Sequence, residues 1–367
     1  MTKIRLLLPL LILALGGTAG PVFAKEARTP YLGAVVTDAL TGRVLFEDQP
    51  DFVTPPASMT KLMTFAVLHD QLASGALALE TPVTVTAEDS RIGGTQVWLK
   101  QGETFPVEEL LYAMMIHSAN DAAHALARAA AGSSAAFVEQ MNAKASALGL
   151  THTTFRTPHG LPPANRRAAD GDLTTPRDYA ILSRYLLRET NVAKYTGVRQ
   201  RKFGEGRRPA DRVIDMINHN HLLGRVAGVN GLKTGYTNSA GYCLAASAER
   251  DGRSIIVIVM GSPDSRTRDL KVIELLDRGF AQASGRLPVV KSDAGVGGAL
   301  RPAPAAAAQS SGHSTVAKAM ADRETPPAET LPTVKTDKTE PANQSEQSST
   351  PKEPGLIFRV TPPSKKP

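Results

Sequence analysis

Two kinds of apolar pattern run through the first 285 residues of the chain. In the middle, apolar residues recur every three or four positions, which is typical of helices with one buried face. This spacing predicts helices over residues 58–74, 107–117, 121–130, 135–148, 176–187 and 266–281. Shorter apolar runs nearer the two ends of this region predict strands over residues 31–37, 43–46, 241–249 and 253–260.

The order of these elements predicts the fold class. Thr41-Gly42 and Asp251-Gly252 each separate two predicted strands, and an Asp-Gly pair between apolar runs is a strong hairpin signal. Strands therefore come from both ends of the region, with helices between them. We expect an α+β fold in which an antiparallel sheet is flanked by helices and joined to a helical lobe.

The two ends of the chain differ from this body in composition. Residues 1–24 begin with two basic residues, continue with an apolar run and end in small residues, which predicts an export signal. An uncleaved anchor is the alternative, although the run is short for an ordinary spanning helix. Residues 286–367 are rich in Pro, Ala, Ser and Thr and carry little apolar surface, which predicts a low-complexity tail without stable structure. Residues 25–285 are expected to form one two-lobed domain of an exported protein, periplasmic or associated with the cell envelope.

Charge and rare residues add little to this picture. The formal net charge is +7, a mild excess that does not indicate nucleic-acid binding. Five basic residues between Arg199 and Arg208 are expected on a solvated hairpin, with attraction to an anionic wall polymer as a minor alternative. The only cysteine, Cys243, cannot form an internal disulfide and is expected to be buried. The only tryptophan, Trp98, is expected to pack rather than to bind a ligand.

Candidate chemistry begins with the string Ser58-Met59-Thr60-Lys61. Three residues apart on a helix, Ser58 and Lys61 lie on one face. A serine hydroxyl is a good nucleophile only when a base takes its proton, and a lysine can take it only as a neutral amine. The pKa of Lys61 would have to fall from about 10.4 to about 7–8, through burial and a neighbouring charge such as that of Lys233. Taken alone, this string is more often a helix cap with a surface lysine.

Two further strings follow in the chain, Ser118-Ala119-Asn120 and Lys233-Thr234-Gly235. A second hydroxyl and an amide could relay a proton and hold a substrate carbonyl, but both residue types are also common in capping turns. The third string enters a strand pattern, where Lys and Thr can hold a carboxylate and glycine lets a substrate backbone approach the sheet edge. A turn with a surface lysine is the alternative. The order of the three strings on helix, loop and strand favours the catalytic interpretation of each.

With these strings, the chain resembles the low-molecular-mass penicillin-binding proteins, the serine D-alanyl-D-alanine carboxypeptidases. The resemblance runs from about Tyr31 to Phe280. It also rests on the longer strings Pro55-Pro56-Ala57-Ser58-Met59-Thr60-Lys61-Leu62-Met63-Thr64, Ser118-Ala119-Asn120-Asp121-Ala122, Pro158-His159-Gly160-Leu161, Gly231-Leu232-Lys233-Thr234-Gly235-Tyr236-Thr237 and Leu275-Leu276-Asp277-Arg278-Gly279-Phe280.

The resemblance implies a peptidase that works through an acyl-enzyme. Ser58 would attack the carbonyl between two D-alanines of a peptidoglycan stem peptide, with Lys61 as base. Ser118 and Lys233 would pass the proton to the departing D-alanine, and water would then free Ser58. Penicillins and other β-lactams would be covalent inhibitors that stop at the acyl stage.

The resemblance also implies the substrate-binding residues. The backbone N–H groups of Ser58 and Tyr236 would form the oxyanion hole, while Thr234 and Arg268 would hold the terminal carboxylate, with Arg266 as the second choice of arginine. The implied substrate-binding set is Asn120, Lys233, Thr234, Gly235, Tyr236 and Arg268.

The chain departs from the family in two places. Many relatives carry a β-rich domain and an amphipathic helix that docks on membrane, and neither is evident in the tail, which puts peripheral membrane contact in doubt. Tyr236 stands where some relatives have histidine, which would alter the deacylation rate.

Other functions remain as alternatives. A D,D-endopeptidase on the same scaffold is the nearest one. A β-lactamase is less favoured, because the loop from Pro158 to Asp172 lacks the glutamate that activates the deacylating water in class A enzymes. A non-catalytic wall-binding protein would need a distorted site. No metal or other cofactor is expected, since there is no H-E-x-x-H string and the spacing of Asn218 to His221 suits no known ligand set.

Overall fold

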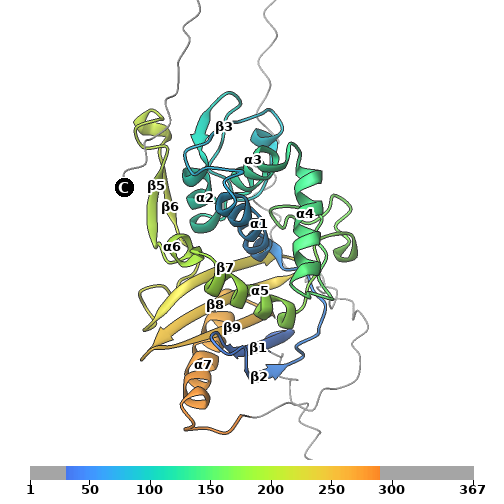
Figure 1. The fold of residues 1–367 in the computed structure, drawn as a ribbon, viewed down its shortest axis with the longest axis vertical. Coiled ribbons are helices and arrows are strands. Elements are labelled where there is room, and N and C mark those ends of the chain that lie inside the picture. The colour runs from blue at the N-terminus through green and yellow to red at the C-terminus, as the bar shows by residue number, and fades with distance from the viewer. Residues whose placement is uncertain (1–29, 290–367) are drawn as a thin grey trace, which may run out of the picture. The chain divides into compact units, whose positions relative to one another are not determined.

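A computed structural model describes residues 30–289, and its elements alternate as the apolar pattern predicts (Figure 1). The predicted signal peptide and nearly all of the predicted tail lie outside the described residues. Five strands form one antiparallel sheet in the order β2-β1-β9-β8-β7. Their bounds are β1 Gly33–Asp38, β2 Val44–Asp48, β7 Val229–Thr237, β8 Gly241–Arg250 and β9 Arg253–Ser262. The α+β fold class is confirmed, because strands from both ends of the described region pair with one another.

Helices fill the middle of this region and close its end. They are α1 Lys61–Ala73, α2 Val107–Ile116, α3 Asn120–Ala131, α4 Ser134–Ala147, α5 Pro176–Glu189, α6 Val192–Thr196 and α7 Ser265–Ala283. All but α6 were predicted to within a few residues. One difference matters for the site: Ser58 lies in a short 3-10 turn, η1 Ala57–Thr60, and the α-helix begins only at Lys61.

The sheet separates two hydrophobic cores, and strand β9 contributes to both. Ile256, Ile258 and Met260 face the helical lobe, whereas Ile255 and Val257 face α7. Figure 1 shows α5 and α7 on opposite faces of the sheet. Because both faces are buried, the sequence of β9 is a continuous apolar run instead of an alternation of apolar and polar residues.

Two small hairpins lie outside the main sheet. Strands β3 Pro82–Thr84 and β4 Thr104–Pro106 form one, and β5 Gln200–Phe203 and β6 Ile214–Ile217 form the other. The second hairpin lies where the basic cluster was expected, but the prediction that this cluster is solvated is wrong for Arg208, which is only 9% exposed. An arginine can be buried in this way when its guanidinium is paired and covers aromatic rings, and here it pairs with Glu103.

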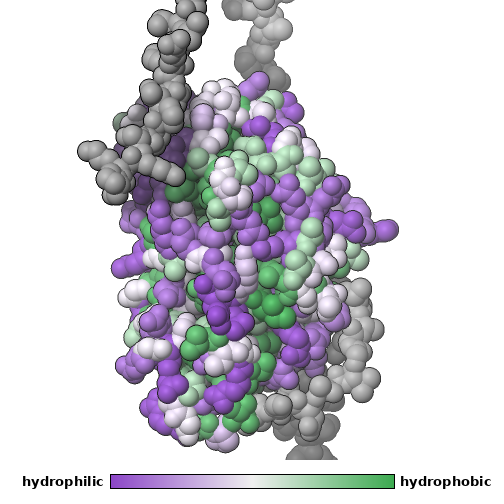
Figure 2. All heavy atoms as spheres, in the orientation of Figure 1, coloured by the Kyte–Doolittle hydropathy of each residue, from purple (hydrophilic) through white to green (hydrophobic). Residues whose placement is uncertain are grey.

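The prediction that Trp98 packs is also wrong, because its side chain is 64% exposed. Cys243 is buried, as expected. Figure 2 shows one face of the molecule, on which hydrophilic residues cover most of the area and hydrophobic residues gather in separate patches. Within residues 30–289, no helix is both long enough and apolar enough to cross a bilayer.

Helix α7 can lie close to the sheet because it carries Gly279 at the contact. A Cβ atom at this position would lie 2.9 Å from a methyl group of Ile255 and 2.9 Å from one of Val36. We therefore expect Gly279→Val to lower the free energy of unfolding by about 1–3 kcal/mol through overpacking. Urea denaturation measures the change. Leu270→Ala on the same helix is the control, since Leu270 is 58% exposed; an equal loss in both variants would contradict the packing argument.

Candidate active site

The structure brings Ser58 and Lys61 together at the start of α1. In a 3-10 turn, side chains three residues apart eclipse one another, and Lys61 Nζ lies 3.1 Å from Ser58 Oγ. Lys61 is fully buried, while Ser58 is partly exposed. The hydroxyl is thus open to a reactant, and the amine beside it is shielded from water.

Two glycines position the backbone on either side of Ser58. A Cβ at Gly160 would lie 2.0 Å from the carbonyl oxygen of Ala57, and one at Gly235 would lie 2.5 Å from that of Pro56. Gly235, expected to admit a substrate backbone, is thus packed against the chain's own turn. Ala57 has a φ of 49°, a left-handed conformation that is strained for a residue with a side chain. The loop carrying Gly160 and strand β7 therefore enclose the turn and hold it in this shape.

The contacts of Lys61 favour its action as a base toward Ser58. Its Nζ lies 2.6 Å from Asn120 Oδ1 and 2.7 Å from the carbonyl oxygen of His159. Both of these oxygens can only accept hydrogen bonds. A neutral amine has two hydrogens and one lone pair, so the two acceptors take the hydrogens. The lone pair is then left for the third neighbour, the hydroxyl of Ser58.

Asn120 is fixed in the orientation that this arrangement needs. Its Nδ2 donates to the carbonyl oxygen of Gly93 at 2.9 Å, which leaves Oδ1 facing Lys61. Asn120 is the first residue of α3, and its backbone N–H donates to the carbonyl oxygen of Thr95 at 2.8 Å. The segment around Gly93 and Thr95 thus holds both the side chain and the backbone of Asn120.

Burial and neighbouring charge lower the pKa of both lysines. Burial is the larger cause for Lys61, whose pKa is well below its usual value, and the charge of Lys233 adds to it. Burial also lowers the pKa of Lys233 to about 7, with a further contribution from Arg268. The region therefore combines a shielded amine with two nearby cationic groups, an environment that attracts an anionic reactant.

The other predicted site residues differ in exposure. Ser118 is buried in a left-handed conformation with a φ of 63°, and its Oγ has no hydrogen-bond partner among residues 30–289. Thr234 and Arg268 are buried, and Arg268 forms an ion pair with Asp269. Tyr236 is half-exposed. The hydroxyl of Ser118 is thus free to bond to a reactant.

Two contacts of the site were not predicted from the sequence: those of the His159 backbone carbonyl and of the Asp172 carboxylate. Asp172 accepts a hydrogen bond from Thr60 Oγ1 at 2.7 Å, and Pro158 O accepts one from Thr64 Oγ1 at 2.6 Å. These contacts attach the loop before α5 to the first turn of α1. The string around His159 indicated that this loop matters, but the type of a residue does not show whether its backbone carbonyl forms a contact.

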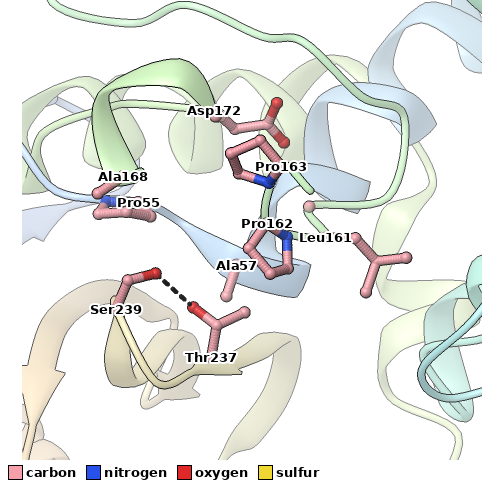
Figure 3. Close-up of a pocket in the computed structure, with 11 residues that line it drawn as sticks. Pro55, Ala57, Leu161, Pro162, Pro163, Ala168, Asp172, Thr237 and Ser239 are labelled. Carbon is pink, nitrogen blue, oxygen red and sulfur yellow. Dashed lines mark hydrogen bonds between the residues drawn. The ribbon is translucent and has the colours of Figure 1, made fainter. Parts of the chain in front are cut away.

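A small cavity lies beside the turn that carries Ser58 (Figure 3). It is about 10 Å³, close to the smallest volume that can hold one water molecule. Thr237 and Ser239 approach it from the end of β7, where their hydroxyls lie 3.2 Å apart. The labelled residues that line it are Pro55, Ala57, Leu161, Pro162, Pro163, Ala168, Asp172, Thr237 and Ser239.

The residues that the structure describes contain no group of three or more His, Cys, Asp or Glu placed to hold a metal ion. His117 and His219 do lie together, with ring centroids 5.8 Å apart. Burial lowers the pKa of both, and the charge of Lys233 lowers it further, to about 4 for His219. These rings are neutral near pH 7 and leave Lys233 and Arg268 as the cationic groups of the site.

Comparison with known sequences gives one consistent family. The sequence profile of the D-alanyl-D-alanine carboxypeptidases matches residues 25–264. The D-alanyl-D-alanine carboxypeptidase DacF of Bacillus subtilis is 35% identical over 286 residues, 76% of this chain and 71% of DacF. DacA of Escherichia coli is 35% identical over 254 residues, 67% of this chain but only 60% of DacA. A D-alanyl-D-alanine endopeptidase of Pseudomonas aeruginosa is 34% identical over 233 residues, 62% of this chain and 70% of that protein.

Similar solved structures come from the same kind of protein. Penicillin-binding protein D2 of Listeria monocytogenes, in its ampicillin-bound form, superimposes with a TM-score of 0.61 at 29% identity, covering 70% of this chain and 99% of that one. The D-alanyl-D-alanine carboxypeptidase DacD of Francisella tularensis gives a TM-score of 0.64 at 27% identity, covering 70% and 71%.

The buried lysines predict a pH-dependent stability. The folded-state pKa of Lys233 is about 7, below its usual value of 10.5, so between these values the unfolded chain binds more protons and wild-type stability rises with pH. Lys233→Met removes the buried charge. We expect this variant to be more stable than wild type at pH 7, with an advantage that shrinks as the pH approaches 10.5.

Denaturant unfolding at several pH values measures this difference. Lys202→Met is the matched control, because the side chain of Lys202 is 54% exposed and its substitution should show little dependence on pH. A stability difference between Lys233→Met and wild type that stays constant from pH 7 to 10 would contradict the assignment.

Proposed function

The chain belongs to the D-alanyl-D-alanine carboxypeptidase family of serine peptidases, and we propose that it removes the terminal D-alanine from peptidoglycan stem peptides through an acyl-enzyme on Ser58. The observation that carries the proposal is the environment of Lys61. A fully buried amine whose two acceptors leave its lone pair facing a partly exposed serine is suited to general-base catalysis.

The first half of the proposed reaction forms an ester. Lys61 takes the proton of Ser58 Oγ, which attacks the carbonyl between the two D-alanines. The backbone N–H groups of Ser58 and Tyr236 stabilise the oxyanion, since donors fixed before the reaction need no reorganisation. The proton then passes to the departing amine by way of Ser118 and Lys233. The unpartnered hydroxyl of Ser118 supports this relay.

Water completes the cycle by attacking the ester and releasing the shortened peptide. The leaving D-alanine carries a carboxylate, which we assign to Thr234, Lys233 and Arg268. Their burial supports this assignment, because an ion pair is stronger where water is excluded. Asn120 would hold the substrate carbonyl with the hydrogen of Nδ2 that Gly93 leaves free. No step in this sequence calls for a metal or cofactor.

The proposed substrate sets the proposed partners and location. Peptidoglycan lies outside the cytoplasm, so we propose an exported protein whose catalytic domain is residues 25–285. We also propose that β-lactams acylate Ser58, since the ampicillin-bound relative shares the fold and penicillins imitate the D-alanyl-D-alanine end. A D,D-endopeptidase that cuts cross-links is the second candidate, supported by the similarity to the Pseudomonas aeruginosa endopeptidase.

The nucleophile and the base can be tested with ampicillin and mass spectrometry. We expect wild type to gain one covalent adduct on Ser58 and Ser58→Ala to gain none. Lys61→Ala should slow acylation by about 10²–10⁴-fold, the usual contribution of a positioned base, without loss of folding. Lys202→Ala is the control for removal of a lysine. Normal acylation of Lys61→Ala would show that another group is the base.

The reaction class can be tested by incubating the protein separately with a pentapeptide that ends in D-alanyl-D-alanine and with a cross-linked dimer. We expect free D-alanine from the pentapeptide and an unchanged dimer, because the buried cationic groups suit a substrate with a free terminal carboxylate. Chromatography of the products measures both. Rapid loss of dimer would favour the endopeptidase, and hydrolysis of ampicillin at many turnovers would favour a β-lactamase.

A further inference from the structure

Trp98 is the single tryptophan of the chain, and its side chain is 64% exposed. Its φ is 55°, a left-handed conformation that is uncommon for any residue except glycine and strained for one so bulky. Such strain persists only where the surroundings enforce it, and it gathers at functional positions. The structure shows what enforces it here.

Asp121 fixes the backbone N–H groups on both sides of Trp98. Its carboxylate accepts hydrogen bonds from Val97 N at 3.2 Å and from Leu99 N at 3.0 Å. Asp121 is fully buried, and so are the side chains of Val97 and Leu99. The residues on either side are therefore anchored inward, and the indole between them is left facing solvent.

Arg208 fixes the carbonyl groups of the same segment. Its guanidinium donates to Val97 O at 2.7 Å and to Trp98 O at 3.1 Å. The group is itself held by Glu103 and covers the rings of Phe105 and Phe203, at 5.1 and 4.9 Å from their centroids. A nearly buried arginine from the β5–β6 hairpin thus completes the anchor of Trp98.

The loop that carries this anchored tryptophan is bonded to one of the proposed site residues. Asp121 directly follows Asn120, whose own N–H bonds to Thr95 O at 2.8 Å. Trp98 is three residues beyond Thr95, a separation of at most about 11 Å along the chain. The indole is therefore carried by a loop that is bonded directly to the residue beside Lys61.

The surface around Trp98 indicates what kind of group it meets. Thr95, Lys100 and Gln101 are exposed, and no other large hydrophobic side chain from this loop is exposed among the described residues. A protein partner would need a larger contiguous apolar surface. One aromatic ring among hydrogen-bonding side chains instead matches a sugar ring, which offers an apolar C–H face and a polar rim.

We propose that Trp98 binds a sugar of the glycan strand to which the stem peptide is attached. This inference rests on the proposed function, because it assumes that the peptide end occupies the site at Ser58. Trp98 would then favour stem peptides that are still joined to their glycan over free peptides. Asp121 and Arg208 act through it as positioning residues.

Kinetics with two substrates test the inference: a free pentapeptide, and the same pentapeptide joined to its disaccharide. We expect Trp98→Ala to raise KM about tenfold for the sugar-bearing substrate only, with kcat for both substrates and the rate of ampicillin acylation unchanged. Trp98→Phe should have a KM for the sugar-bearing substrate close to that of wild type, because it keeps an aromatic ring. Leu40→Ala is the matched control, since Leu40 is a 70% exposed apolar residue in the turn between β1 and β2. An equal rise in KM for both substrates, or no rise for either, would overturn the inference.

Fluorescence gives a readout that does not depend on turnover. Because Trp98 is the only tryptophan, its emission reports on this position alone. In Ser58→Ala, we expect the sugar-bearing peptide to shift the emission at concentrations where the free peptide does not, and an unchanged emission with both peptides would overturn the inference. If wild type cleaves neither substrate while this shift is present, the proposed function fails and the sugar site stands.

Discussion

The reaction that we propose for this protein depends on one buried amine. Lys61 is fully buried beside Ser58, and its amine donates hydrogen bonds to two oxygens that can only accept them. A charged amine in this place would be destabilised by desolvation and by the charge of Lys233. The same burial that disfavours the ammonium form therefore suits Lys61 to its proposed role as a base. The proposed reaction then needs no separate activating residue such as histidine.

Holding the amine there requires unfavourable conformations elsewhere. Ala57 and Ser118, on two sides of the site, both have left-handed backbones, and the packing of Gly160 and Gly235 around the turn leaves no room for a side chain. Strain of about 1–3 kcal/mol per residue is usual at such positions and is offset by the rest of the fold. The large two-sided core of the sheet is the available source of that stability.

The sequence predicted the elements of the fold well, because the helices and strands each bury an apolar face or run. It also predicted that Ser58 and Lys61 lie side by side, and the 3.1 Å contact between them agrees, while the roles of these residues stay predictions. It did not predict the carbonyl of His159, because every residue has one. It misjudged Arg208, because only the folded structure places Glu103 and two aromatic rings around that guanidinium.

Trp98 is a second residue whose exposure could not be predicted from the sequence. From sequence, a lone tryptophan most often packs, and the flanking Val97 and Leu99 do pack. The exposure of the residue between them follows from a carboxylate and a guanidinium that are far from it in sequence. The carboxylate, Asp121, follows Asn120, and the guanidinium belongs to Arg208 between β5 and β6. Because those two groups hold the segment whether or not the ring contacts anything, the orientation of Trp98 is built into the scaffold. A ring that is presented at the expense of backbone strain, on a loop bonded to Asn120, agrees with the proposed contact with the substrate.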